Sequence, residues 1–326
     1  MRRLSTQDQN FKQAFAELLA FETVNDPQLV QTVDQIIADV RQHGDEHVLK
    51  LTQQFDRHPA HQFSDLELSQ QQLKTAFEGL SAEVREALEL AAQRIRSFHQ
   101  AQKQEGWTYV DELGNTLGQK VTPLDRVGIY VPGGLASYPS SVLMNIVPAR
   151  VAGVDEIIMV TPPGADGRVN ANTLVAACEA GATAIYKVGG AQAIGALAYG
   201  TESIPKVDKI VGPGNIYVAL AKKAVYGHVS IDAIAGPSEI MVVADETANP
   251  RYVAADLLSQ AEHDEMASAI LVTTSEKLAR EVSDQVDGFL KELSRADIIQ
   301  KSLDNYGYIL IADTMDEVID IANEIA

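Results

Sequence analysis

The stretch Arg126-Val-Gly-Ile-Tyr-Val-Pro-Gly-Gly134 marks the point where the pattern of the sequence changes. A short apolar run rich in β-branched residues, with a strand predicted over Val127–Val131, ends in a turn of proline and paired glycines. Similar runs, each followed by a glycine- or proline-containing turn and a helix-like segment, occupy Glu156–Val160, Ala184–Val188 and Lys209–Val211. Strands that alternate with helices in this way indicate βαβ units and a parallel sheet.

A second series of apolar runs follows, with helix-like segments between them, at Ile240–Ala244, Ala269–Thr273 and Tyr308–Ile311. The turn Gly236-Pro-Ser-Glu239 lies between the two series, and we predict a domain boundary there. The expected fold is therefore α/β, with two Rossmann-like βα domains that each hold a parallel sheet.

The first hundred residues read as helices. Asp26-Pro27 is typical of a helix start and Gly44 of a helix end, and a longer amphipathic helix begins near Ser81. We predict a split domain made of residues 1–126 and 239–326, with residues 127–238 inserted as a βα domain.

The chain of 326 residues carries a formal charge of −19. A surface this acidic repels phosphate backbones and anionic lipid, so we expect no nucleic-acid or membrane partner. A signal peptide and a membrane-spanning run are not recognised either, so a cytoplasmic location is expected. The one cysteine, Cys178, lies in an alanine-rich stretch and is predicted to be a small buried side chain rather than a nucleophile.

Three loop segments are candidates for nucleotide binding because ligands of open α/β sheets bind outside the carboxyl ends of strands. Tyr130 precedes the first glycine turn, and on this segment alone a tight strand-to-loop turn is the preferred interpretation. Gln192 follows the glycines of Val188-Gly-Gly190, which open a helix, but the GxGxxG spacing of the standard dinucleotide motif is absent. Asn215 ends Gly212-Pro-Gly-Asn215, where it is suited to cap the next helix.

The fourth candidate segment, for which a position at the carboxyl ends of strands is likewise expected, is Ser259-Gln-Ala-Glu-His-Asp264. Gln260 and His263 are three residues apart and would share one face of a helix. Histidine and side-chain amides can bind zinc, but a zinc site needs about four donors. From spacing alone, a surface or capping role is the preferred interpretation of His263.

Taken together, several long segments resemble the histidinol dehydrogenase family, in the family's order, over roughly residues 120–326. They are Arg126–Asn145, Val188–Thr201, Val207–Val218, Ile234–Ile240 and Ala254–Asp264. The resemblance implies a zinc- and NAD-dependent oxidation of L-histidinol to L-histidine through the aldehyde. It also implies a homodimer.

The resemblance further implies roles for individual residues. Tyr130, Gln192 and Asn215 match NAD-contacting positions, Ser238 matches a substrate-contacting serine, and Gln260 and His263 match zinc ligands that also hold the substrate. The family's glutamate and histidine, which serve as base and proton carrier, would lie beyond Ala326, so no catalytic residue is assigned. We therefore expect a truncated chain without activity.

Two alternatives stay open at this point. One is an NAD-linked dehydrogenase of similar architecture that acts on another alcohol or aldehyde, which would need a catalytic cysteine or another base. The other is a fragment that binds nucleotide without turnover.

Overall fold

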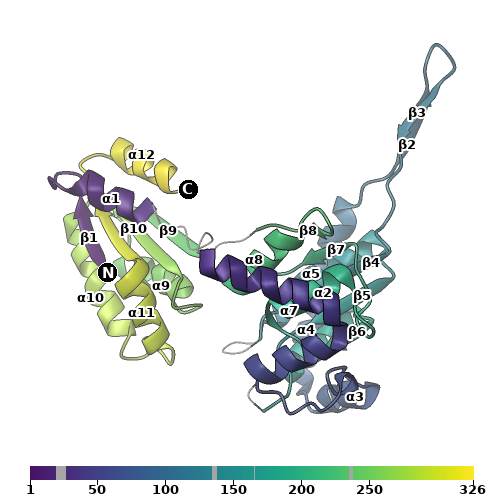
Figure 1. Ribbon diagram of the computed structural model, residues 1–326. Coiled ribbons are helices and arrows are strands. Elements are labelled where there is room, and N and C mark those ends of the chain that lie inside the picture. The colour runs from purple at the N-terminus through teal and green to yellow at the C-terminus, as the bar shows by residue number, and fades with distance from the viewer. Residues whose placement is uncertain (20–26, 134–137, 165, 235–237) are drawn as a thin grey trace. The chain divides into compact units, whose positions relative to one another are not determined.

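The computed structural model describes residues 1–19, 27–133, 138–164, 166–234 and 238–326. The chain forms two compact units, one made of residues 25–234 and the other of residues 1–24 and 235–326. Each unit contains its own parallel sheet, as the two series of strand-like runs predict (Figure 1). In the described ranges no helix is both long enough and apolar enough to span a membrane.

The unit of residues 25–234 is built on a five-stranded parallel sheet with strand order β6-β5-β4-β7-β8. Its strands are β4 (Arg126–Tyr130), β5 (Glu156–Val160), β6 (Ala184–Tyr186), β7 (Lys209–Val211) and β8 (Ser230–Ile231). The helices that connect them are α5 (Pro139–Ala152), α6 (Ala171–Ala180), α7 (Gly190–Tyr199) and α8 (Ile216–Val225).

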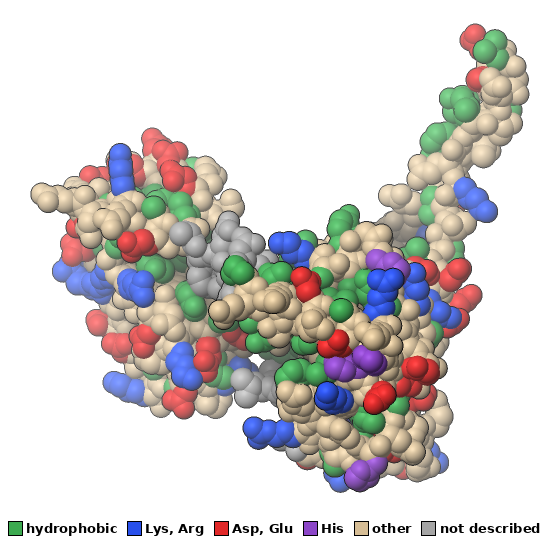
Figure 2. Space-filling model, viewed as in Figure 1, with side chains coloured by type: hydrophobic (Ala, Val, Ile, Leu, Met, Phe, Trp, Pro, Cys, Tyr) green, Lys and Arg blue, Asp and Glu red, His purple; other side chains and the backbone are tan. Residues whose placement is uncertain are grey.

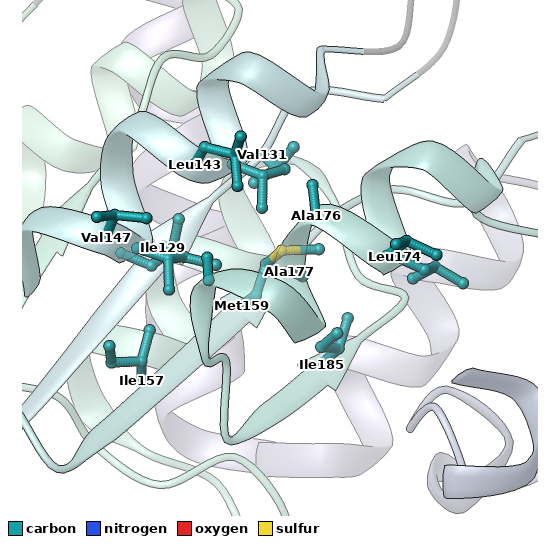
Figure 3. Packing of buried hydrophobic residues seen from close by; sticks show 14 of the residues in the cluster. Ile129, Val131, Leu143, Val147, Ile157, Met159, Leu174, Ala176, Ala177 and Ile185 are labelled. Carbon is teal, nitrogen blue, oxygen red and sulfur yellow. The ribbon is translucent and has the colours of Figure 1, made fainter. Parts of the chain in front are cut away.

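Helices cover both faces of this sheet because its strands are apolar on both sides. Ile129 and Val131 pack with Leu143 and Val147 of α5 on one face, and Met159 lies in the same cluster (Figure 3). Successive side chains of a strand point to opposite faces, so the side chain of Tyr130 points to the face covered by α7 and α8.

The helices near the N-terminus form an outer layer on the same unit. They are α2 (Pro27–Phe55), the 3₁₀ turn η2 (Phe63–Asp65), α3 (Gln70–Glu78) and α4 (Ala82–Gln102). Helix α2 lies against α7 and α8, while α3 and α4 lie against α6 and α5. The predicted assignment of residues 25–126 to the split domain is therefore wrong. Amphipathic periodicity shows that a helix has an apolar face, but not which sheet buries it.

Two predicted helix boundaries can be compared with the structure. Ser81 caps α4 by accepting a hydrogen bond from the Val84 N–H, as expected. Gly44 does not end its helix: it forms a kink inside α2 with φ of 54°. Asp26, the predicted cap of that segment, lies outside the described residues.

A hairpin that the sequence analysis did not predict joins α4 to β4. It consists of β2 (Trp107–Val110) and β3 (Thr116–Gln119), paired antiparallel. The hairpin extends away from the five-stranded sheet, and apolar side chains lie along it (Figures 1 and 2). Exposed members of this apolar set are Trp107, Tyr109, Val110, Leu113 and Leu117.

The other unit has a four-stranded parallel sheet with strand order β1-β11-β10-β9. The strands are β1 (Arg2–Ser5), β9 (Glu239–Ala244), β10 (Ser268–Thr273) and β11 (Gly307–Ile311). One face of the sheet packs against α9 (Pro250–Ala261), α10 (Glu276–Phe289) and α11 (Ala296–Tyr306), and the other against α1 (Phe11–Leu19) and α12 (Met315–Ile325). The edge strand β1 was not predicted, because four residues with two arginines carry no alternating apolar pattern.

Candidate functional site

The carboxyl edge of the five-stranded sheet gathers two glycine turns around Tyr130, the last residue of β4. The side chain of Tyr130 is buried, and its hydroxyl accepts a hydrogen bond from the Gly190 N–H at 3.2 Å. Burial raises the pKa of Tyr130 to about 12. The phenol therefore stays neutral and keeps its own hydrogen available for donation.

The first turn opens helix α7 directly after β6. Gly190 has φ of 64°, and a Cβ at this position would lie 2.7 Å from Oε1 of Gln192. Gln192 is itself only 2% exposed, in the first turn of the helix. The glycine thus allows a buried amide to pack against the N-terminal turn of α7, next to the Tyr130 hydroxyl.

The second turn, Gly212-Pro-Gly-Asn215, follows β7, which pairs with β4 in parallel. Gly212 has φ of 116°, and a Cβ there would collide with the carbonyl group of Tyr130. Asn215 caps α8 by accepting from the Val218 N–H at 3.2 Å, as the sequence predicts, and it remains exposed. The structure therefore brings Tyr130 against both turns, through its hydroxyl on one side and its backbone on the other.

One acidic residue near this edge was not considered as a site residue in the sequence analysis. Asp56 follows α2, and its Oδ2 atom is buried without a hydrogen-bond partner in the described ranges of the chain. Burial raises the pKa of Asp56 to about 6, and the Asp56 charge contributes to the raised pKa of Tyr130. The available signal was an acidic residue directly after a long amphipathic helix, but its polar neighbours made the segment resemble a solvated linker.

The remaining candidate residues lie in the other unit, at the opposite kind of edge. Ser238 directly precedes β9, and its carbonyl oxygen accepts from the Ser268 N–H at 3.1 Å, at the start of β10. Gln260 lies in the last turn of α9, which leads back to the start of β10. Ser238 and Gln260 are therefore at the amino ends of the strands, so the expected position at the carboxyl ends is wrong for the Ser259–Asp264 segment.

Gln260 and His263 are close in the chain but do not share a helix. Helix α9 ends at Ala261, and His263 lies in the following turn, where its N–H donates to the Gln260 carbonyl oxygen at 3.0 Å. The three-residue spacing is thus kept by a turn rather than by a helix face. His263 is exposed, and its carbonyl oxygen accepts from Arg295 at 3.3 Å.

Gln260 provides a test of whether this region suits a cation. Its Nε2 atom is buried and has no hydrogen-bond partner among the residues that the structure describes. The two ends of an amide exchange by a half-turn of the group, which would place the oxygen at the same buried position. A buried amide without a partner costs about 1–3 kcal/mol, so the group fits a ligand role. In the described part of the chain, no three His, Cys, Asp or Glu side chains gather at metal-binding distance.

A cavity of about 380 Å³ opens at the same amino edge of the four-stranded sheet. Glu239 and Ser268 belong to the wall of this cavity, and Ser238 is the residue before Glu239 in the sequence. Its polar and aromatic lining consists of Arg2, Glu17, Glu239, Ser268, Asn305, Tyr306 and Tyr308. The amino edge is therefore hollowed and lined mainly by polar groups, beside the predicted substrate-contacting serine.

Cys178, the one thiol of the chain, lies in α6 and is exposed, so the prediction of a buried side chain is wrong. The helix buries its alanines instead, including Ala176 and Ala177. Desolvation and the neighbouring Glu179 raise the pKa of Cys178. A nucleophilic cysteine needs a lowered pKa, so this thiol does not suit a thiol-dependent dehydrogenase.

Comparisons with known proteins agree with one another. A family model described as histidinol dehydrogenase matches residues 20–326. The histidinol dehydrogenase of Acinetobacter baylyi is 68% identical over 326 residues, which are 100% of this chain and 76% of that protein. The histidinol dehydrogenase of Psychrobacter arcticus is 57% identical over 328 residues, with the same coverage of 100% and 76%.

A solved structure extends the agreement to the fold. The crystal structure of histidinol dehydrogenase from Elizabethkingia anophelis has a TM-score of 0.86 and 36% sequence identity. It covers 100% of this chain, which in turn covers 74% of that chain.

Proposed function

The chain belongs to the histidinol dehydrogenase family, and from this we propose that it serves the NAD-dependent, four-electron oxidation of L-histidinol to L-histidine through the aldehyde. The observation that carries the assignment of residues is the pair of glycine turns around Tyr130. Backbone N–H groups at helix starts after parallel strands suit the phosphates of a dinucleotide. NAD would accept the hydrides of the reaction when bound there.

Tyr130, Gln192 and Asn215 are proposed to contact NAD. The neutral Tyr130 phenol keeps a hydrogen to donate while it accepts from Gly190, and Gln192 offers a buried amide at the start of α7. Asn215 uses its side-chain oxygen as a cap, which leaves its NH₂ group to donate toward a ligand.

Ser238, Gln260 and His263 are proposed to serve the substrate and zinc. Gln260 and His263 would supply an amide oxygen and an imidazole nitrogen, and Ser238 a hydroxyl for the substrate. Bound zinc would hold the substrate and polarise its reacting oxygen. Two neutral donors do not fill a zinc site, so further donors must complete it.

A homodimer is proposed as the assembled form. The exposed aromatic and aliphatic side chains of the β2–β3 hairpin support a partner surface, because contiguous exposed apolar side chains mark interaction sites. Light scattering of the wild type beside a Trp107→Ser, Leu117→Ser variant tests this. A variant that keeps the wild-type mass would remove the hairpin from the proposed interface.

The proposed activity is tested by following NADH formation from histidinol. The assay compares this chain with a chain extended by the C-terminal residues of the Acinetobacter baylyi relative, with zinc supplied to both. We expect the extended protein to form NADH with histidinol and not with aliphatic alcohols of similar size. A protein that binds NADH but oxidises only other alcohols would contradict the proposal that histidinol is the substrate.

A further inference from the structure

An ion pair between a buried lysine and a partly exposed aspartate lies at the second glycine turn of the five-stranded sheet. Lys222 belongs to α8, and Asp232 follows β8; the two side chains form an ion pair. Lys222 is only 4% exposed. Neither residue is a predicted site residue.

Both charged groups are bonded to the same residue of the turn. Lys222 Nζ donates to the Gly212 carbonyl oxygen at 3.0 Å, and the Gly212 N–H donates to Asp232 Oδ2 at 2.8 Å. The other carboxylate oxygen accepts from the Ala233 N–H at 2.7 Å. Burial alone would raise the pKa of Asp232, but the bonds from Lys222, Gly212 and Ala233 outweigh it and lower the pKa.

The N–H and carbonyl groups of Gly212 need side-chain hydrogen-bond partners because the backbone around the turn does not supply them. Gly212 is buried, its φ of 116° departs from strand geometry, and the next residue is a proline without an N–H. Without the two side chains, the N–H and carbonyl groups of Gly212 would both be buried and unpaired. An ion pair with one partly exposed member contributes little to stability by itself, so holding the backbone of Gly212 is the role that the geometry supports.

Resting on the proposed NAD site, we infer that Lys222 and Asp232 are positioning residues that fix the Gly212–Asn215 turn for binding the dinucleotide. They act through Gly212, which lies against the Tyr130 backbone, and through Asn215 three residues on. The pair would hold the turn in its binding geometry before NAD arrives, so that no ordering is required on binding.

The test is NADH affinity, measured by fluorescence titration, in Lys222→Met and in the milder Asp232→Asn. The matched control is Arg126→Met. Arg126 also combines an ion pair, to Glu156 at 2.6 Å, with a bond to a backbone carbonyl, that of Lys206, at 2.8 Å. Its pair lies at the amino edge of the same sheet, away from the turns.

We expect Lys222→Met to weaken NADH binding about tenfold and Asp232→Asn by about threefold, since one or two buried peptide groups lose a partner. Arg126→Met should keep the wild-type dissociation constant for NADH, even if its melting temperature falls as much as those of the Lys222 and Asp232 variants. Amide exchange should rise over residues 209–215 in the two pair variants only.

The inference is overturned if both pair variants bind NADH within twofold of the wild type, or if the control weakens binding equally. Asn215→Ala separates this from a failure of the proposed function. If Asn215→Ala weakens binding and the pair variants do not, the positioning role alone is wrong. If Asn215→Ala has no effect, or the wild type does not bind NADH, the proposed NAD site is wrong and this inference fails with it.

Discussion

The two candidate regions lie at opposite kinds of sheet edge and are built in different ways. The carboxyl edge of the five-stranded sheet is assembled from backbone turns, and Tyr130 touches both of them from within. The amino edge of the four-stranded sheet presents separate side chains: Ser238 before a strand, Gln260 at a helix end, and His263 in a turn.

This difference separates what each region can do with its own residues. The first edge combines helix starts after parallel strands, which suit phosphate, with the side chains of Tyr130, Gln192 and Asn215. Gln260 and His263 are two neutral donors and need additional ligands to hold zinc. The nucleotide side is thus predicted to bind with only the residues described, whereas the metal side depends on groups added to it.

The largest expected effect is on zinc content and turnover, and it comes from a change at the amino edge. In the chain extended by the C-terminal residues of its relative, His263→Ala should lower the bound zinc and reduce kcat/KM by at least about 100-fold, because even residues behind the ligands change metal affinity by 10–100-fold. Metal content by mass spectrometry and initial rates measure this. NADH affinity should stay at the wild-type value, and a parallel loss of NADH binding would show that His263 also contributes to nucleotide binding.

Gly212→Ala should instead weaken NADH binding and leave zinc binding unchanged. A Cβ at this position collides with the Tyr130 carbonyl in addition to the cost of a positive φ. We expect NADH binding to weaken at least about tenfold, with a loss of about 2–4 kcal/mol in the free energy of unfolding. Gly227→Ala is the control, because Gly227 has φ of 95° and open space around its Cβ position. Equal effects on binding from both variants would show that overlap with Tyr130 does not matter.

Asp56→Asn should change the pH dependence of stability at the first edge. The folded-state pKa of Asp56, about 6, lies above its ordinary value of 3.8, so the unfolded chain loses this proton first. The resulting decrease in the free energy of unfolding is absent at low pH, develops between about pH 4 and pH 6, and is complete above that range. The variant should therefore be more stable than wild type at pH 7.5 by about 1–2 kcal/mol, after allowance for the exposed part of the carboxyl group.

Chemical denaturation at pH 4 and pH 7.5 measures the effect of Asp56→Asn. The two proteins should differ least at the lower pH. A stability difference that does not change between the two pH values would mean that the Asp56 carboxyl group does not titrate in this range. In a spectrophotometric titration, the pKa of Tyr130 should also fall in the variant, because one negative charge near the phenol is removed.

The smallest expected effect is that of Cys178→Ser. The thiol is exposed and has a raised pKa, so turnover of the extended protein should stay within about twofold and stability within about 0.5 kcal/mol. Alkylation with iodoacetamide should likewise leave the rate unchanged. A large loss of rate would favour a thiol-dependent dehydrogenase and would place the chemistry away from both edges.

The sequence by itself determined seven strands of the two parallel sheets, the helix caps Ser81 and Asn215, and the family. Runs such as Glu156–Val160 are apolar on both faces, which is typical of a buried parallel strand. Asn215 and Ser81 cap helices by bonds to residues three positions away, which sequence order alone specifies. The candidate residues of the first edge follow from the same local rules, since parallel strands end together.

Only the tertiary structure decided which sheet buries α2 and α4, why Gly212 is held from both sides, and where Gln260 lies. Lys222 and Asp232 both bond to the backbone of Gly212, from ten and twenty residues away in the sequence. The side chain of Cys178 is exposed because neighbouring alanines fill the buried face of α6. Such contacts depend on the packing of elements distant in sequence, and local periodicity contains no information about the partner that an apolar face or a buried charge will meet.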